Sequence, residues 1–230
     1  MATKTQTIMT VKNFDINNLK FQEPTKNKLG GKVVYMNYKD SRLNLQTPWM
    51  KLPFGLSVYE DQSKGITKKY SVDLSFQNMD NDPKIKEFYD KCQEFDNHLL
   101  DVAVQNSKEW FGKKMKKEVL EELMRPLTKQ PKDDKYSPTF KIKINNIDRV
   151  DCYDIDKNRM SIMDLAKGSK GKVIMECSSV WFVGNNFGVS FSLVQLMVDP
   201  PEQIAGFAFK DDSDDEEEAE EEEEEVEEED

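Results

Sequence analysis

The sequence predicts a mainly β protein with a helical insertion, an α+β fold that ends in an acidic tail. Three observations support this class. Short segments rich in β-branched and aromatic residues, separated by turn residues, lie before position 80 and after position 138. Between them, apolar residues recur every three or four positions, which is typical of helices. The last twenty residues, 211–230, are almost all Asp or Glu.

The first part of the chain predicts several strands. Residues 1–30 are polar with scattered apolar positions and predict an N-terminal arm or an edge strand. Residues 32–38 are rich in β-branched and aromatic side chains, and residues 42–47 alternate polar and apolar. Prolines interrupt 48–55, so that stretch predicts a strand edge or a loop. Residues 70–77 alternate most strictly and predict a strand with one buried face.

The middle of the chain predicts a helical insertion at about 83–125. Asp82 is a favourable N-cap, and Pro83 suits the first helical position. The apolar residues from Ile85 to Val102 form one stripe at helical spacing. A second helix is expected over 108–124, with Ser107 as its cap.

The last part of the body returns to strand patterns. Residues 139–145 alternate, which places Lys141 and Lys143 on the face opposite the apolar residues. Residues 172–183 and 187–198 flank a Gly-Asn-Asn turn and predict a β-hairpin. Residues 31–210 are therefore expected to form one domain.

This order of elements predicts an OB-fold-like antiparallel barrel. The oligonucleotide-binding (OB) fold is a five-stranded barrel that holds single strands on one face, between its loops. Its helix is expected between the third and fourth strands. A jelly roll would also accept these strands and is the alternative.

The charge distribution favours a polyanionic ligand. Residues 211–230 contain seventeen acids and no Lys or Arg, and removing them from the formal net charge of −11 leaves +6 for residues 1–210. Such a tail should be disordered. A flexible polyanion tethered to a basic body competes for its surface, so the predicted ligand is nucleic acid. The alternative is a solubility or partner-docking tail without a gating role.

The sequence offers little for catalysis or metal binding. It has one histidine, His98, inside the predicted helical stripe, and three widely spaced cysteines. No phosphate-binding glycine loop, GxSxG or HExxH motif occurs, so we expect no enzyme activity, cofactor or metal. The odd cysteine count favours reduced thiols in an intracellular compartment. No apolar run is long enough to span a membrane, and the N-terminus lacks a secretory signal pattern.

Single strands are held by aromatic faces under the bases and by cations along the phosphates. Candidates are therefore aromatic residues close to Lys or Arg, together with cations expected on wet strand faces or hairpin tips. About half of the aromatic candidates are expected to be core residues instead. The predicted nucleic-acid-binding residues are Lys32, Tyr35, Tyr38, Lys39, Arg42, Trp49, Lys51, Phe54, Lys68, Lys69, Tyr136, Lys141 and Lys143.

Three segments carry a resemblance to a known family. They are SRLNLQTPWMKLPFGLSVYED at 41–61, YSVDLSFQ at 70–77 and YSPTFKIKI at 136–144, with the helical segment between the last two. In this order they resemble the single-stranded DNA-binding proteins of nucleocytoplasmic large DNA viruses, of the asfarvirus, iridovirus and phycodnavirus type. The resemblance covers about 32–198. It implies an OB fold and sequence-tolerant binding of single-stranded DNA in viral replication, repair or recombination.

The resemblance also implies partners and a location. Single-stranded DNA, or RNA, is the expected ligand, and the oligomeric state is left open between a monomer and a homo-oligomer. The acidic end is similar to those of phage and bacterial single-strand binders, which recruit replication proteins, although this chain lacks their aromatic tip. The expected location is the host nucleus or a cytoplasmic virus factory, or the virion. Two rival interpretations are an acidic-tailed chaperone for basic proteins and a β-sandwich virion component.

Overall fold

The structure, a computed structural model, describes residues 7–28, 30–61, 67–133 and 135–202. The expected acidic tail at 211–230 lies outside these residues, and so do residues 62–66 just before Lys68 and Lys69. Within the described ranges, no helix is long and apolar enough to cross a membrane.

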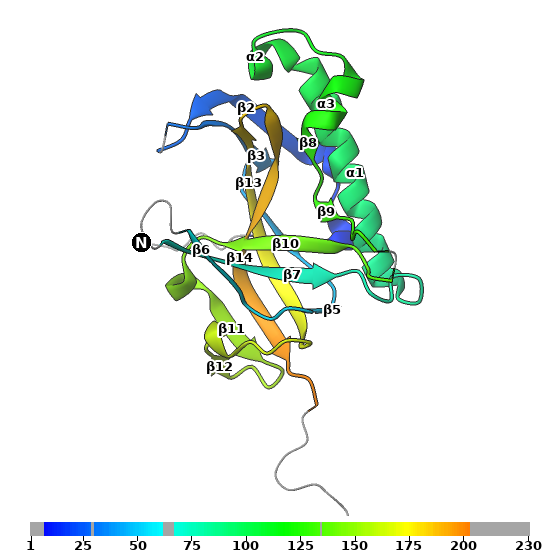
Figure 1. Ribbon diagram of the computed structural model, residues 1–230, viewed down its shortest axis with the longest axis vertical. Helices are drawn as coiled ribbons and strands as arrows, with labels where there is room; N and C mark the ends of the chain where they lie inside the picture. The colour runs from blue at the N-terminus through cyan, green and yellow to red at the C-terminus, as the bar shows by residue number, and fades with distance from the viewer. Residues whose placement is uncertain (1–6, 29, 62–66, 134, 203–230) are drawn as a thin grey trace, which may run out of the picture.

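Five strands close into a barrel (Figure 1). They are β5 (Met50–Lys51), β7 (Thr67–Ser75), β10 (Thr139–Ile144), β14 (Asn186–Asp199) and β13 (Lys170–Val183). Each pairs with the next, and β13 pairs with β5 to close the ring. All pairs are antiparallel except β10 with β14. This single closed barrel confirms the OB-fold-like class, and the jelly-roll alternative is wrong.

Shorter elements extend the barrel. β4 (Leu43–Gln46) precedes β5 and also pairs with β13, while β6 (Ser57–Asp61) pairs with β7. The remaining short strands are β8 (Met124–Arg125), β9 (Thr128–Lys129), β11 (Asp151–Asp154) and β12 (Arg159–Met160). The 3₁₀ turns are η1 (Val11–Asn13), η2 (Ile16–Asn18), η3 (Ile147–Arg149) and η4 (Ile162–Asp164).

The N-terminal segment is part of the sheet. β1 (Ile8–Thr10) pairs in parallel with β4, and β2 (Leu19–Lys26) pairs with β3 (Lys32–Tyr38). β3 in turn pairs with the upper part of β13. The β2–β3 hairpin therefore enlarges the sheet above the barrel, and residues 7–26 are more than the single arm or edge strand expected.

The long helix α1 (Pro83–Gln105) begins as its sequence predicts. The Asp82 side chain accepts hydrogen bonds from the backbone N–H groups of Lys84 (2.9 Å) and Ile85 (3.3 Å), and Pro83 follows it. The helix lies between β7 and β10, the second and third strands of the barrel. The expectation of a helix between the third and fourth strands is therefore wrong; β11, β12 and two 3₁₀ turns occupy that connection.

The second expected helix is two short helices. α2 (Ser107–Phe111) and α3 (Lys117–Leu123) are separated by Gly112, whose φ of 76° is in the left-handed region and ends α2. Ser107 is not the cap expected for it but the first residue of α2, and its hydroxyl accepts a hydrogen bond from the backbone N–H of Met115. The apolar spacing continues through the break, which is why the pattern predicted one helix.

The core lies between α1 and the inner side of the barrel. Phe88 packs against Phe140 of β10, with ring centroids 5.4 Å apart, and Phe95 packs against Phe191 of β14 at 6.0 Å. Phe14, which follows η1, reaches the same cluster. Because α1 covers this side, the outward-facing residues of β7 and β10 lie on the opposite side, away from the helix.

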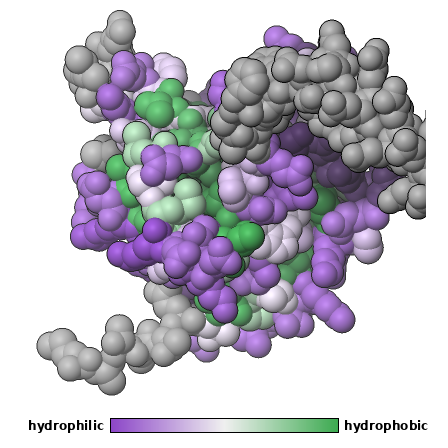
Figure 2. Space-filling view, turned by 90° about the horizontal axis from the view of Figure 1, so that it is seen from below, coloured by the Kyte–Doolittle hydropathy of each residue, from purple (hydrophilic) through white to green (hydrophobic). Residues whose placement is uncertain are grey.

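The lower end of the barrel carries exposed apolar side chains. Figure 2 views the molecule from this end and shows apolar residues between hydrophilic ones. Trp49, Phe54, Ile155 and Met163 are exposed large apolar residues, and they belong to the segments around β5, β11 and η4. Chain segment 200–202 leaves the barrel at this end (Figure 1).

Candidate nucleic-acid interface

The helices cover only one side of the sheet. On that side Phe21 of β2 and Phe182 of β13 pack against Trp110 of α2, and Phe187 of β14 packs against Phe111. Figure 1 shows α1, α2 and α3 together on this side, while the other side of β3, β13, β10 and β7 carries no helix among the described residues. We call the helix-free surface of β6, β7, β10, β13 and β14 the open face; its central residues are Tyr59, Lys69, Lys143, Trp181 and Ser190.

Two lysines lie together at the centre of the open face. Lys143 is opposite Ser71 in the β10–β7 ladder, and Lys69 is two residues before Ser71 on the same face. Such diagonal neighbours on a sheet are roughly 7–8 Å apart at Cα. Lys143 Nζ donates to the hydroxyl of Ser190, at 2.8 Å, on the adjacent strand β14. The two lysines thus place positive charge on strands that are far apart in the sequence.

The electrostatics of Lys143 reflect its burial and a second positive charge close to it. Desolvation, and secondly the positive charge of Lys69, lower the pKa of Lys143. A lysine paired with a carboxylate would have the opposite shift. An anion placed between the two ammonium groups would relieve their repulsion, so this part of the open face suits a phosphate.

Two aromatic residues flank the lysines. Tyr59 of β6 is opposite Lys69 in the β6–β7 ladder, and Lys69 Nζ lies 5.9 Å from its ring centroid. On the other side, Lys143 Nζ lies 6.0 Å from the ring centroid of Trp181 of β13. Tyr59 is 63% exposed and can offer a ring face to a base.

Gly188 allows Trp181 to reach Lys143. Trp181 and Gly188 are opposite each other in the β13–β14 ladder. β14 lies between β13, which carries Trp181, and β10, which carries Lys143. A Cβ added at Gly188 would lie 2.9 Å from Cζ2 of Trp181 and 2.8 Å from the carbonyl oxygen of Arg125. The indole therefore lies over the bare backbone of β14. Its Nε1 is buried and has no hydrogen-bond partner among the described residues.

Substituting Gly188 should displace this ring. In Gly188→Ala the new methyl group overlaps both the indole and the carbonyl of Arg125, so we expect a shifted tryptophan emission and a loss of about 1–3 kcal/mol in the free energy of unfolding. Ser190→Ala is the control: it lies two residues after Gly188 on β14, removes only the hydroxyl that accepts from Lys143, and should leave the emission unchanged. An unchanged spectrum in Gly188→Ala would contradict the placement of the indole.

Most of the predicted cations outside this centre pair with acids or serve the fold. Arg42 pairs with Glu176 at 3.1 Å, Lys68 with Glu60 at 3.5 Å, and Lys141 with Asp73 at 2.7 Å. Lys68 also faces away from Lys69, because neighbouring residues of a strand point to opposite sides. Lys141 shares the outer side of β10 with Lys143, but Asp73 already neutralises it.

Two predicted residues belong to the structure and not to the open face. Tyr38 is 6% exposed, its ring packs against Phe14, and its hydroxyl accepts a hydrogen bond from the backbone N–H of Asp15. Lys32 faces the helices, where its ammonium group donates to the carbonyl of Trp110 and lies 5.2 Å from the ring centroid of Phe182. Tyr38 therefore packs in the core and Lys32 packs on the helix side, away from the open face.

The other predicted residues are accessible but lie elsewhere. Tyr35 of β3 lines a surface pocket of about 260 Å³ beside Arg42, and Lys39 follows in the turn after β3. Tyr136 precedes β10, at the opposite end of that strand from Lys143. Trp49, Lys51 and Phe54 lie at the lower end, around the pairing of β5 with the start of β13. Of the predicted set, the structure brings Lys69, Lys141 and Lys143 together on the open face. It also places Tyr35 and Arg42 at one pocket, and Trp49, Lys51 and Phe54 at the lower end.

Tyr59, Trp181 and Ser190 of the open face were not among the residues predicted from the sequence. The sequence contained a signal for Tyr59, because it lies in the strand just before Lys68 and Lys69, which were predicted to bind nucleic acid. The sequence contained no such signal for Trp181, because its indole reaches Lys143 only by lying across β14 at Gly188.

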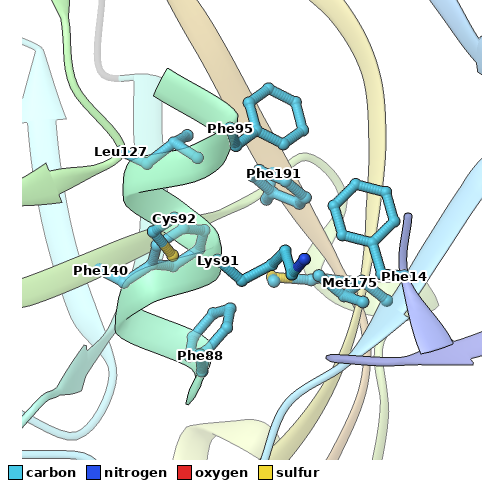
Figure 3. A pocket seen from close by; sticks show the side chains of 10 residues that line it. Phe14, Phe88, Lys91, Cys92, Phe95, Leu127, Phe140, Met175 and Phe191 are labelled. Atoms are coloured by element: carbon cyan, nitrogen blue, oxygen red, sulfur yellow. The ribbon is translucent and has the colours of Figure 1, made fainter. Parts of the chain in front are cut away.

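The core void between α1 and the barrel is not a ligand site. Figure 3 shows aromatic side chains of α1, β10 and β14 around it. Its volume of about 10 Å³ is at the lower limit for one water molecule, and its lining is apolar apart from Lys91. In the described part of the chain, no group of three or more His, Cys, Asp or Glu residues could hold a metal ion.

The fold and the open face define this molecule as an OB-fold-like barrel with a helical insertion and a cationic, aromatic surface. The chain belongs to a family of unknown function (DUF5871), whose profile matches residues 72–211. A search of curated proteins finds no match.

Some solved structures are similar at low identity. The single-stranded DNA-binding protein gp2.5 of bacteriophage T7 is 17% identical, with a TM-score of 0.45, over 72% of this chain and 97% of that chain. The single-stranded DNA-binding protein of bacteriophage Enc34 is 13% identical, with a TM-score of 0.42, over 85% of this chain and 98% of that chain. The Enc34 protein in a complex with single-stranded DNA is 12% identical, with a TM-score of 0.41, over 80% of this chain and 98% of that chain.

Proposed function

We propose that this protein binds single-stranded DNA through the open face, without sequence preference and without catalysis. The observation that carries the proposal is the Lys69–Lys143 centre, where two cations repel each other between Tyr59 and Trp181. Cations that follow the backbone, together with rings under the bases, are what sequence-tolerant single-strand binding requires.

The geometry also favours single strands over duplexes. A ring can stack only on a base that is free of its complementary partner, and Tyr59 offers an exposed ring beside the lysine centre. The serines around Lys143 supply neutral hydrogen-bonding groups for backbone oxygens. None of these contacts depends on the identity of a base, so binding should tolerate any sequence.

A fluorescence-anisotropy titration with a labelled poly-dT oligonucleotide tests this function. We expect binding that weakens with salt at a slope of about −0.7 per phosphate contacted, and little competition from duplex DNA. Equal competition by the duplex would contradict the single-strand preference. Absence of binding in dilute buffer would contradict the function itself, and would leave the two rival interpretations, a chaperone for basic proteins or a virion component.

The sequence supports a more specific role in viral DNA metabolism. We propose that the protein supports viral DNA replication, repair or recombination in the host nucleus or a cytoplasmic virus factory. The resemblance of the segments at 41–61, 70–77 and 136–144 to viral single-strand binders supports this role. The acidic run at 211–230 would compete with DNA for the basic body or recruit replication proteins.

Removing residues 211–230 tests the competition. The truncated protein loses seventeen acids, so it should bind poly-dT more tightly at low salt, with a difference that shrinks as salt screens the charges. The matched control is the full-length chain in the same salt series. An affinity that truncation leaves unchanged at low salt would mean that the acidic run does not compete with DNA.

A further inference from the structure

An apolar segment follows the last described residue, Glu202, in the sequence. Residues 204–209 have the sequence IAGFAF, in which Gly206 is the only residue that is not apolar. The last described residue, Glu202, is exposed, and a chain advances at most about 3.6 Å per residue. Residue 204 therefore lies within about 7 Å of Glu202, and residue 209 within about 25 Å.

The strand pairings show what surrounds this exit. Asp199, the last residue of β14, pairs with Lys170, which in turn pairs with Lys51 of β5. On the other edge, Val198 pairs with Asp154 of β11, which Ile155 follows directly. The chain therefore leaves the barrel between the segment that carries Trp49 and the segment that carries Ile155.

The other two apolar side chains belong to the same end. The loop that carries Phe54 packs closely on the segment after η4, since a Cβ at Gly55 would lie 2.6 Å from the carbonyl oxygen of Leu165. Met163 is two residues before Leu165. The exposed fractions are 39% for Trp49, 54% for Phe54, 53% for Ile155 and 59% for Met163. Figure 2 shows the apolar residues of this end lying between hydrophilic ones.

The family profile provides an independent observation. It extends through 204–209 and ends at residue 211, where the acidic run begins. The apolar segment therefore lies inside the stretch that the family model matches, whereas nearly all of the acidic run is outside it. This grouping of the segment with the folded body favours a contact between the two.

We propose that residues 204–209 dock on the lower apolar surface formed by Trp49, Phe54, Ile155 and Met163 of the same chain. Tethering favours this occupant, because a segment held within about 25 Å is present at a high effective concentration. Burial of Phe207 and Phe209 against the surface removes apolar area from water on both sides. Docking also fixes the start of the acidic run at the lower end of the barrel. The contact does not depend on nucleic-acid binding.

Oxidation of Met163 by hydrogen peroxide, followed by mass spectrometry of proteolytic peptides, tests the contact in the full-length chain. Exposed methionines oxidise readily, so Met163 in the wild type should oxidise at least about threefold more slowly than in Phe207→Ser/Phe209→Ser. Ala219→Ser/Val226→Ser, in the acidic run outside the docking segment, is the matched control and should behave as the wild type. Met115, between α2 and α3 at the opposite end of the molecule (Figure 1), should oxidise at one rate in all three proteins.

Equal Met163 rates in the wild type and the Phe207→Ser/Phe209→Ser variant would overturn the proposal. Protection that disappears when the wild type is diluted would overturn it too, since it would show that a second copy covers the surface. If the contact fails while poly-dT binding persists, only the docking is wrong. If poly-dT binding fails while Met163 is protected, the docking stands without the proposed function.

Discussion

Replacing Lys69 and Lys143 together by glutamine should weaken single-stranded DNA binding by roughly 10- to 100-fold near 0.1 M salt and reduce the salt slope by about 1.4. These lysines place two positive charges at the centre of the open face, and each contributes about 0.7 to the slope if it contacts a phosphate. Loss of phosphate contacts should reduce affinity for all sequences alike. The measurement is the anisotropy titration with poly-dT over a range of salt concentrations.

Lys84→Gln/Lys86→Gln is the matched control for this variant. Both residues are exposed on α1, on the helix side of the molecule, and the control changes the net charge by the same amount. It should keep nearly all of the affinity, since the ion pair of Lys86 with Asp90 is exposed and contributes little to stability. If the two double variants lost affinity equally, binding would depend on total charge and not on the open face.

The second large effect concerns stability and involves Asp96 in the middle of α1. Its side chain is 5% exposed, and both carboxylate oxygens accept a hydrogen bond from the backbone N–H of Leu127, at 3.2 and 3.1 Å. Burial raises the pKa of Asp96 to about 7, although the hydrogen bond from Leu127 acts in the opposite direction. Asp96 joins α1 to the chain that leads from α3 into β9.

This pKa gives stability a definite pH dependence. The folded protein holds a proton on Asp96 up to about pH 7, whereas the unfolded chain releases it near pH 4. The folded state therefore binds more protons between these values, and the contribution to stability falls as pH rises through this window. Between pH 5 and pH 8.5 the loss from this one group should be about 2–3 kcal/mol.

Asp96→Asn should remove this component of the pH dependence. Asparagine can still accept the hydrogen bond from Leu127 and stays neutral, so the variant should lose less stability than the wild type between pH 5 and pH 8.5. Chemical denaturation at the two pH values measures the effect. Asp101→Asn is the control, because that carboxylate is exposed on the same helix and pairs with Lys117. An unaltered pH dependence in Asp96→Asn would show that the carboxylate is already ionised in the folded protein at pH 5.

Local patterns predicted the elements well, and their pairing less well. Strand β3 and the start of α1 follow directly from β-branched composition and from the Asp82-Pro83 cap. The break at Gly112 was not predicted, because glycine interrupts a helix without disturbing the apolar spacing on either side. The place of α1 between the second and third barrel strands was not predicted either, because it depends on which of many short strands close the ring.

The candidate site shows the same limit more strongly. The alternation of β10 correctly placed Lys141 and Lys143 on one outer side. It could not show that Lys141 meets a carboxylate on β7 while Lys143 meets a serine on β14, since that difference comes from the cross-strand partners. Aromatic residues close to cations in sequence were also a poor guide, because Tyr38 is in the core whereas Trp181 reaches Lys143 across β14.

The most direct test of the open face is lysine footprinting. Acetylation of the full-length protein with and without a saturating poly-dT oligonucleotide, followed by mass spectrometry, reports which ammonium groups the DNA covers. We predict that Lys69 and Lys143 are protected and that Lys84 on α1 reacts equally in both samples. Protection of Lys84 with no change at Lys69 and Lys143 would contradict the assignment of DNA binding to this face.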